Sequence, residues 1–183
     1  RSLPLVIEAQ YRALAEIPYA GIAATTDLGN PTCIHPARKR EVGERLAFLA
    51  LANDYGVKGL PAPAPVYKSM ERDGNKLVLT FDNLPVKARN GVDSFVAFGP
   101  DGYRRPAGFE IAGEDRVFHP AVANFKYWDN RIEVSSDRVP EPVAVRYAFR
   151  NYCPEANVVT TMGQPLAPFR TDDWPLDDIG EIR

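Results

Sequence analysis

The chain has 183 residues, enough for one ordinary domain or two small ones, and 45% of them are hydrophobic and 25% charged. This balance is typical of a globular protein with a packed core. A formal net charge of −2 provides no basic surface for nucleic acid or an anionic membrane, and no apolar run approaches the length of a transmembrane helix. Cys33 and Cys153 are too few for a disulfide framework or a structural zinc site. A first residue that is Arg rather than Met suits a fragment or a processed chain.

The chain opens with a predicted helix and strand. Ser2-Leu3-Pro4 is typical of a helix start, and an apolar stripe runs from Val6 to Ile17 before Pro18. The apolar run Ile22-Ala23-Ala24 then predicts a strand without strict alternation, as in a strand covered on both faces. No second strand is predicted in residues 1–56, so we expect the rest of its sheet to come from elsewhere.

A loop carrying a histidine separates this strand from a second helix. Gly29-Asn30-Pro31 ends the strand, and Ile34-His35-Pro36 comes directly before the helix. The apolar positions of the helix have helical spacing, and Gly56 ends it. Opposite charges four residues apart are expected on its solvent face, at Arg40 with Glu44 and Glu41 with Arg45. Residues 1–56 therefore predict a closing αβα piece of a parallel-sheet domain, with His35 beside the carboxyl end of a strand, where active-site groups gather in such folds.

The second part of the chain has a different pattern. Prolines alternate at positions 61, 63 and 65, so residues 57–65 predict an extended linker. Residues 66–175 then show short segments with period two, separated by turns such as Asp73-Gly74-Asn75, and predict an antiparallel β-sandwich. Residues 176–183 are expected to form a loosely held tail. The predicted fold class is α/β plus all-β.

Several phrases of the sequence carry a resemblance to one family. In the first part they are Asp27-Leu28-Gly29, Ile34-His35-Pro36, Lys39 and the helix from Val42 to Gly56. In the second part they are GFEIAGED (108–115), EVSSDRV (133–139), PVAVRYAF (142–149) and PLAPFRTDDWP (165–175). These phrases, in this order, resemble the carboxyl-terminal portion of the sialate O-acetylesterases, which are SGNH (GDSL-like) hydrolases with a flavodoxin-like fold. The resemblance implies that residues 1–56 close an SGNH domain and that a β-domain follows it.

The resemblance also implies a chemistry. In such an esterase a serine attacks the acetyl carbonyl, a histidine takes the serine proton and returns it to the leaving alkoxide, and an acid often orients the imidazole. His35 matches the histidine of the family. Many SGNH enzymes have Asp three residues before it, but Thr32 stands there, so Asp27 is the nearest upstream carboxylate. Asp27 is either this acid or a cap for backbone N–H groups of the loop, and a dyad whose imidazole is oriented by a backbone carbonyl is the third possibility.

No serine of the chain lies in a nucleophile motif. Gly91-Val92-Asp93-Ser94 is the nearest match, but it opens a predicted β-strand rather than a strand-to-helix turn. The expected function is hydrolysis of O-acetyl groups of sialic acid, with the nucleophile outside this chain and without metal or cofactor. The expected partners are the acetylated sugar and the remainder of the SGNH domain, and the resemblance implies a secreted or periplasmic protein. The alternatives are an acetyl esterase acting on plant polysaccharide and a non-catalytic β-sandwich that binds carbohydrate or a partner.

Overall fold

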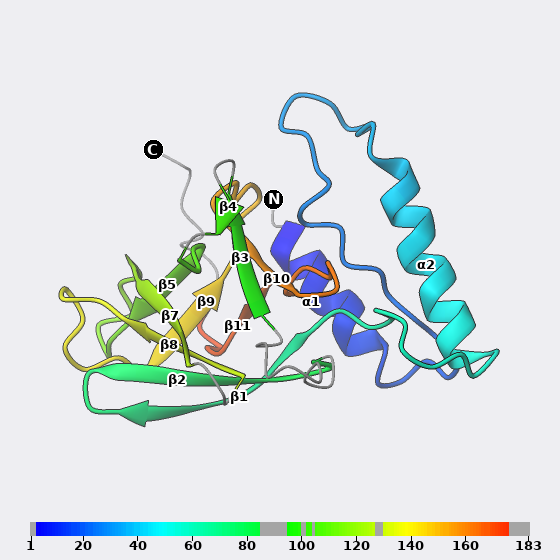
Figure 1. The fold of residues 1–183 in the computed structure, drawn as a ribbon. Helices are drawn as coiled ribbons and strands as arrows, with labels where there is room; N and C mark the ends of the chain where they lie inside the picture. The colour runs from blue at the N-terminus through cyan, green and yellow to red at the C-terminus, as the bar shows by residue number, and fades with distance from the viewer. Residues whose placement is uncertain (1–2, 85–94, 100–101, 104, 127–129, 176–183) are drawn as a thin grey trace.

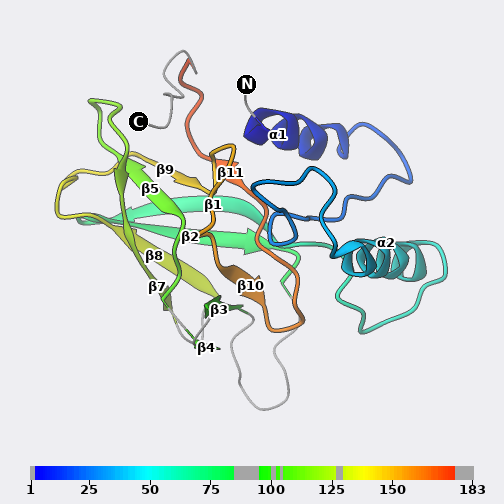
Figure 2. The ribbon, with the colours of Figure 1, turned by 90° about the horizontal axis from the view of Figure 1, so that it is seen from above.

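The computed structural model describes residues 3–84, 95–99, 102–103, 105–126 and 130–175. In this part of the chain, two helices lie to one side of a β-rich region built of three antiparallel sheets (Figures 1 and 2). The prediction of antiparallel strands after residue 65 is confirmed. The predicted tail, the first two residues and Ser94 lie outside the described residues.

Helix α1 spans Leu3–Ala13 and helix α2 spans Lys39–Asn53. The first is shorter than predicted, because the chain passes into turns after Ala13, where Glu16 and Ile17 both donate their N–H to the Ala13 carbonyl. The second ends as predicted near Gly56, which adopts a left-handed φ of 68°. Both helices expose apolar side chains: Leu3 and Val6 of α1 and Leu46 of α2 are 51–55% exposed.

The predicted strand between the helices is not formed. Residues 20–25 run as an irregular segment, and within the described part of the chain they join none of the three sheets. A strand exists only where a neighbouring backbone accepts and donates its hydrogen bonds, and no described segment supplies one here. The closing αβα piece is therefore not seen in this structure.

The first sheet has the order β1-β2-β8-β7, and these strands span Val66–Asp73, Lys76–Asp82, Arg131–Ser135 and Val122–Lys126. A two-residue turn joins β1 to β2, with Asp73 paired to Lys76 and Gly74 at a φ of 60°. Only glycine adopts such a φ without a steric cost, so the predicted Asp73-Gly74-Asn75 turn is confirmed.

The other two sheets complete the β-rich region. One has the order β10-β3-β4, with strands at Val158–Thr160, Phe95–Gly99 and Gly102–Tyr103. The other has the order β11-β9-β5-β6, with strands at Phe169–Arg170, Ala144–Tyr147, Phe109–Ala112 and His119–Pro120. All pairings are antiparallel.

One hydrophobic core joins the three sheets. Alternate residues of β2 face it, and it takes side chains from each sheet, including Leu79, Ile111, Ile132, Val145 and Val158, all at most 1% exposed. This contiguous cluster holds the sheets together, because apolar area removed from water is the main stabilising term in a small domain. The β-rich region is thus the rigid body against which the helical part is placed.

The proline-rich segment packs on this body. Ala62, Ala64 and Pro65 are buried, and the Pro65 carbonyl accepts a hydrogen bond of 3.1 Å from the Ala167 N–H. The segment is irregular rather than helical, as its prolines predict.

Two polar contacts fasten α1 to the β-rich body. The Leu3 N–H donates to the Asn151 side chain at 2.9 Å, and Glu8 forms an ion pair with Arg170 at 3.3 Å. Arg170 is held in turn beside Asp172, whose side chain is fully buried and accepts two hydrogen bonds from Arg146. The carboxyl-terminal strand therefore anchors the amino-terminal helix.

Candidate functional site

His35 lies in an exposed loop between residue 27 and the start of α2. Local bonds shape this loop: the Thr32 N–H donates to the Asn30 side chain at 2.9 Å, and the Cys33 thiol donates to the His35 carbonyl at 3.3 Å. Within the described residues, the His35 imidazole forms no hydrogen bond or ion pair. His35 is therefore exposed at the surface of the loop, with both ring nitrogens unbonded in the described part of the chain.

The base of the loop is closed by Arg38. Its guanidinium donates to the Asp27 carbonyl at 3.2 Å and to the Glu41 carboxylate at 2.7 Å. The hydrogen bond from Arg38 holds the pKa of Glu41 below its usual value. The two ends of the loop, at residues 27 and 38, are thereby held side by side.

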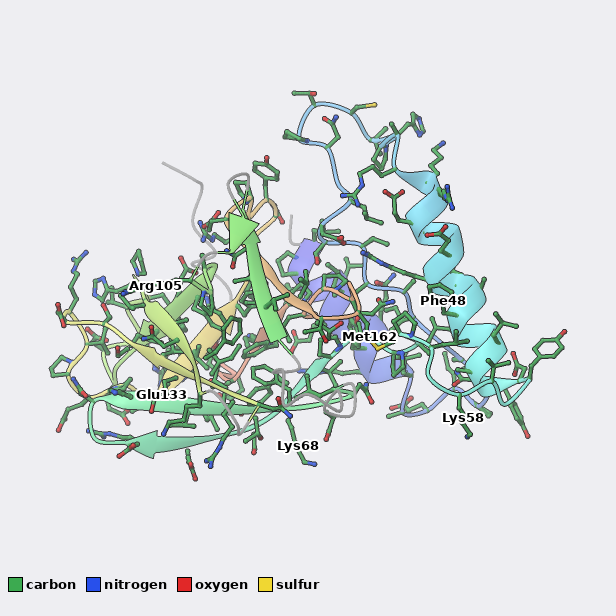
Figure 3. All side chains as sticks on the ribbon, in the orientation of Figure 1. Phe48, Lys58, Lys68, Arg105, Glu133 and Met162 are labelled. Atoms are coloured by element: carbon green, nitrogen blue, oxygen red, sulfur yellow. The ribbon has the colours of Figure 1, made fainter. Side chains whose placement is uncertain are left out.

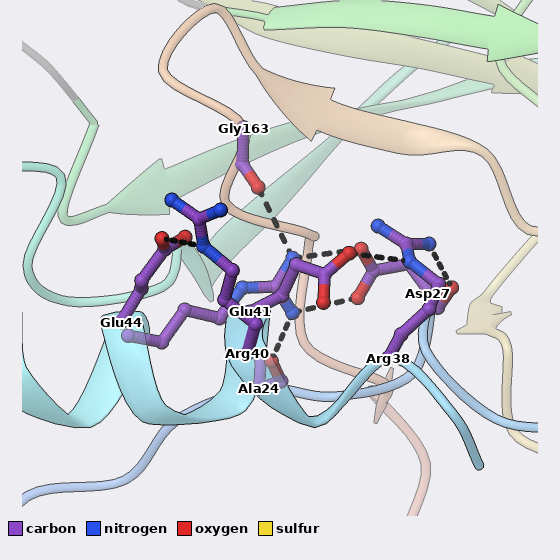
Figure 4. Close-up of polar contacts among 8 residues, drawn as sticks. Ala24, Asp27, Arg38, Arg40, Glu41, Glu44 and Gly163 are labelled. Carbon is purple, nitrogen blue, oxygen red and sulfur yellow. Dashed lines mark hydrogen bonds and ion pairs between the residues drawn. The ribbon is translucent and has the colours of Figure 1, made fainter.

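Arg45 of α2 is the central residue of this site, because its guanidinium bonds to Ala24, Asp27 and Gly163, which Figure 4 labels. Its side chain is 8% exposed. One nitrogen donates to the Ala24 carbonyl at 2.6 Å and to one Asp27 carboxylate oxygen at 2.7 Å. The other donates to the second Asp27 oxygen at 2.7 Å and to the Gly163 carbonyl at 3.3 Å. The guanidinium thus joins α2 to the segment before the loop and to the turn after β10.

Asp27 is therefore engaged with Arg45. Both carboxylate oxygens accept from the guanidinium, and within the described residues none accepts from a backbone N–H of the loop or from His35. The structure places Asp27 and His35 at the base and in the body of one loop without a bond between them. The role of Asp27 as the orienting acid remains a prediction.

The sequence reasoning missed Arg45, which it placed on the solvent face of α2 with Glu41 as partner. The pair of Arg40 with Glu44 is formed as predicted, at 2.7 Å, whereas Glu41 binds Arg38 instead. A signal was available, because Arg45 lies one helical turn before Leu49, which is buried at 8% exposure. Residues four apart share a helix face, so Arg45 had to point inward with Leu49.

The serines of the chain belong to the β-rich body or lie outside the described residues. The described serines, Ser69, Ser135 and Ser136, lie in β1, at the end of β8 and directly after it, and Ser69 bonds to Thr80 at 2.7 Å. Cys153 is half-buried, and burial raises the pKa of its thiol to about 11, so it is an inert thiol at neutral pH.

Trp174 and His119 also belong to the β-rich body. Trp174 packs on Phe118 and under Arg116, whose guanidinium carbon lies 5.4 Å from its ring centre. His119 lies in β6, where it pairs with Ile111. Tyr127 and Trp128 lie outside the described part.

Neither of two surface hollows contains His35. One, of about 230 Å³, lies between the segment from Tyr19 to Gly21 and the inner face of α2. The other, of about 340 Å³, lies beside Arg72, Gly113 and Arg138 of the β-rich body. Among the described residues, no three His, Cys, Asp or Glu side chains are grouped as metal ligands, and no helix is long and apolar enough to cross a membrane.

Comparison with known proteins finds a similar protein among the solved structures. No family model matches this chain, and no curated protein matches it. The crystal structure of XAC1771 from Xanthomonas citri matches it with a TM-score of 0.80 and 42% sequence identity. That protein is a carbohydrate acetylesterase. The match covers 93% of this chain and 36% of that one, so this chain spans little more than a third of the enzyme it resembles.

Proposed function

We propose that this chain is the carboxyl-terminal part of a carbohydrate acetylesterase, in which His35 is the general base. The observation that carries the proposal is the likeness to XAC1771, at 42% identity over 93% of this chain. Such identity supports a related activity as well as a related fold. The exposed loop that presents His35 with both nitrogens unbonded within the described residues is consistent with this role.

The proposed reaction is acyl transfer to a serine and then to water. His35 accepts the serine proton as the oxygen attacks the acetyl carbonyl, and returns it to the sugar oxygen as that bond breaks. His35 then removes a proton from water as the water attacks the acetyl-enzyme, and returns this proton to the serine oxygen as acetate leaves and the free serine forms. An imidazole suits both steps, because its ordinary pKa is near neutrality. Asp27 orients the imidazole in this proposal only if the loop brings the ring within hydrogen-bond reach of one of its oxygens, each of which keeps a free lone pair beside its single bond from Arg45.

The serine is proposed to lie outside this chain, in the remainder of an SGNH domain. Two features support this: apolar side chains of α1 and α2 are exposed, and residues 20–25 run beside α2 without strand partners among the described residues. An interface with strands outside this chain would cover the apolar side chains and would pair the backbone of residues 20–25. The 64% of XAC1771 without a counterpart here is large enough to supply such a partner. Fast amide exchange over residues 20–25 in this chain, and slow exchange in the complete protein, is the expected result.

O-Acetylated sialic acid is the proposed substrate, on the strength of the sequence resemblance, and acetylated plant polysaccharide is the alternative. A secreted or periplasmic location is proposed on the same ground. The test is acetate release by the complete protein from O-acetylated sialic acid and from acetylated xylan, side by side. Turnover of sialate alone supports the proposed substrate, and turnover of xylan alone selects the alternative. No turnover of any acetylated sugar would contradict the esterase and leave a binding role.

This chain alone is expected to release no acetate from p-nitrophenyl acetate or from acetylated sugar. Enzyme-like turnover by the chain that disappears in a Ser94→Ala variant would contradict the placement of the nucleophile elsewhere.

A further inference from the structure

The turn between β10 and β11 meets the helical part at a polar junction. Thr160 and Gln164 of this turn are buried at 2% and 4% exposure, and Arg45 of α2 at 7%. Figure 3 shows Met162 of the same turn on the side of the helices, whereas Glu133 lies on the far side of the β-rich body. Buried polar groups at a contact between segments define one geometry when every group is bonded.

Hydrogen bonds link the two ends of this turn to each other and to the segment before β1. The Thr160 N–H donates to the Gln164 carbonyl at 2.8 Å, and the Gln164 N–H donates to the Thr160 hydroxyl at 3.1 Å. The Gln164 amide group also donates to the Pro61 carbonyl at 2.6 Å. These bonds fix the Gly163 carbonyl, which accepts from Arg45. Arg45 is thus held from the side of the β-rich body.

Arg45 also binds the residues that come directly before the histidine loop. The same guanidinium binds both oxygens of Asp27 and the Ala24 carbonyl, which precede the loop. Arg38 binds the Asp27 carbonyl where the loop ends. The loop from residue 28 to residue 37 therefore starts and ends on groups that Arg45 and α2 hold in place.

We propose that Arg45 is a positioning residue for His35: through Asp27 it fixes the start of the histidine loop to the Thr160–Gln164 turn. The proposal rests on His35 being the general base, and it gives the β-rich body a part in the reaction. A misplacement of about 1 Å of a catalytic group can cost on the order of 100-fold in rate, so a residue that touches no substrate can still control kcat.

Arginine is the side chain that this position requires. Its planar fork reaches both Asp27 oxygens and two carbonyls at once, whereas the ammonium of lysine is a compact point charge on a flexible stem. Arg45→Lys therefore keeps the charge that neutralises Asp27 and loses the geometry. Arg40→Lys, on the same helix and at an exposed surface pair, is the matched control.

The first measurement uses this chain labelled with ¹³C at histidine and with ¹⁵N. His35 and His119 are its two histidines, so their ring signals are separable. In Arg45→Lys the backbone heteronuclear Overhauser effects of residues 28–37 are expected to fall and the His35 ring signal to change, while His119 stays as it was. Arg40→Lys is expected to leave all of these signals unchanged. If Arg45→Lys does not fold, Asp27→Asn provides the same readout, because it weakens the same contact from the other side.

The second measurement uses the complete protein. Arg45→Lys is expected to lower kcat by roughly 10- to 100-fold with KM within twofold, at a temperature where the variant remains folded. An unchanged loop and an unchanged kcat in folded variants would overturn the proposal. A loop that loosens in a protein where His35→Ala has no effect would instead support the contact and contradict the proposed function.

Discussion

Replacing Arg45 with methionine should cost this chain about 2–3 kcal/mol of unfolding free energy. The change keeps the length of the side chain and removes its charge and its hydrogen bonds to three groups: Ala24, Asp27 and Gly163. Breaking a buried ion pair by removing one partner costs about 3–5 kcal/mol, because the remaining charge is left without compensation. Asp27 retains 27% exposure of its side chain and recovers part of its hydration, so the expected cost lies at or just below the lower end of that range.

The assay is urea unfolding followed by fluorescence of the two tryptophans. Arg40→Met is the control, because Arg40 is an exposed member of a surface pair on the same helix, and no measurable change is expected for it. Asp27→Asn and the double variant complete a thermodynamic cycle. The double variant should cost clearly less than the sum of the single ones, because each single change already breaks the contact. Additive losses, or an Arg45→Met variant as stable as Arg40→Met, would refute the reasoning.

Three further predictions concern stability. In the same urea assay, Gly108→Ala should lose about 1–3 kcal/mol more unfolding free energy than Gly74→Ala. Both glycines have a positive φ, but only at Gly108 would the new Cβ meet a backbone atom, 2.9 Å away in Ala156. Equal losses in the two variants would contradict this prediction. Tyr11→Phe should keep stability or raise it by up to about 1 kcal/mol, since the buried Tyr11 hydroxyl has no described partner. The same variant should lose less stability at alkaline pH. Burial raises the pKa of Tyr11 to about 12, so the stability that comes from keeping its hydroxyl protonated is present below pH 10 and is lost as the pH rises through 12. Glu133→Gln should flatten the acid limb of the stability profile, because the hydrogen bond from Lys126 lowers the pKa of Glu133 and its contribution, present above about pH 4.5, is lost as the pH falls through the lowered value; an unchanged acid limb would count against the pair.

The β-rich part of the fold could be predicted where local pattern and turn chemistry agree. Segments such as Leu77 to Phe81, rich in β-branched and other apolar residues, follow a glycine turn, and they form strands. The strands that sequence reasoning did not identify carry no such pattern: β1 is mostly polar beyond Tyr67, and β11 has two residues. Their position depends on partners distant in the chain.

In the helical part, local pattern predicted a strand that does not form. Residues 22–24 have the apolar composition of a strand, but strand pairing depends on a second backbone that composition does not supply. The positions of proline and glycine correctly predicted where the histidine loop and α2 lie. The contact between Arg45 and Asp27 joins residues 18 apart, and a local rule assigned Arg45 to Glu41 instead. Only the shared face with Leu49 could have corrected this.

The central claim is that His35 is the general base of an acetylesterase, and kcat for acetate release by the complete protein with His35→Ala tests it most directly. His119→Gln is the control, because His119 lies in β6 of the β-rich body. We predict that His35→Ala lowers kcat by roughly 10²- to 10⁴-fold with little change in KM, and that the control keeps normal kinetics. Near-normal turnover by a folded His35→Ala protein would contradict the account.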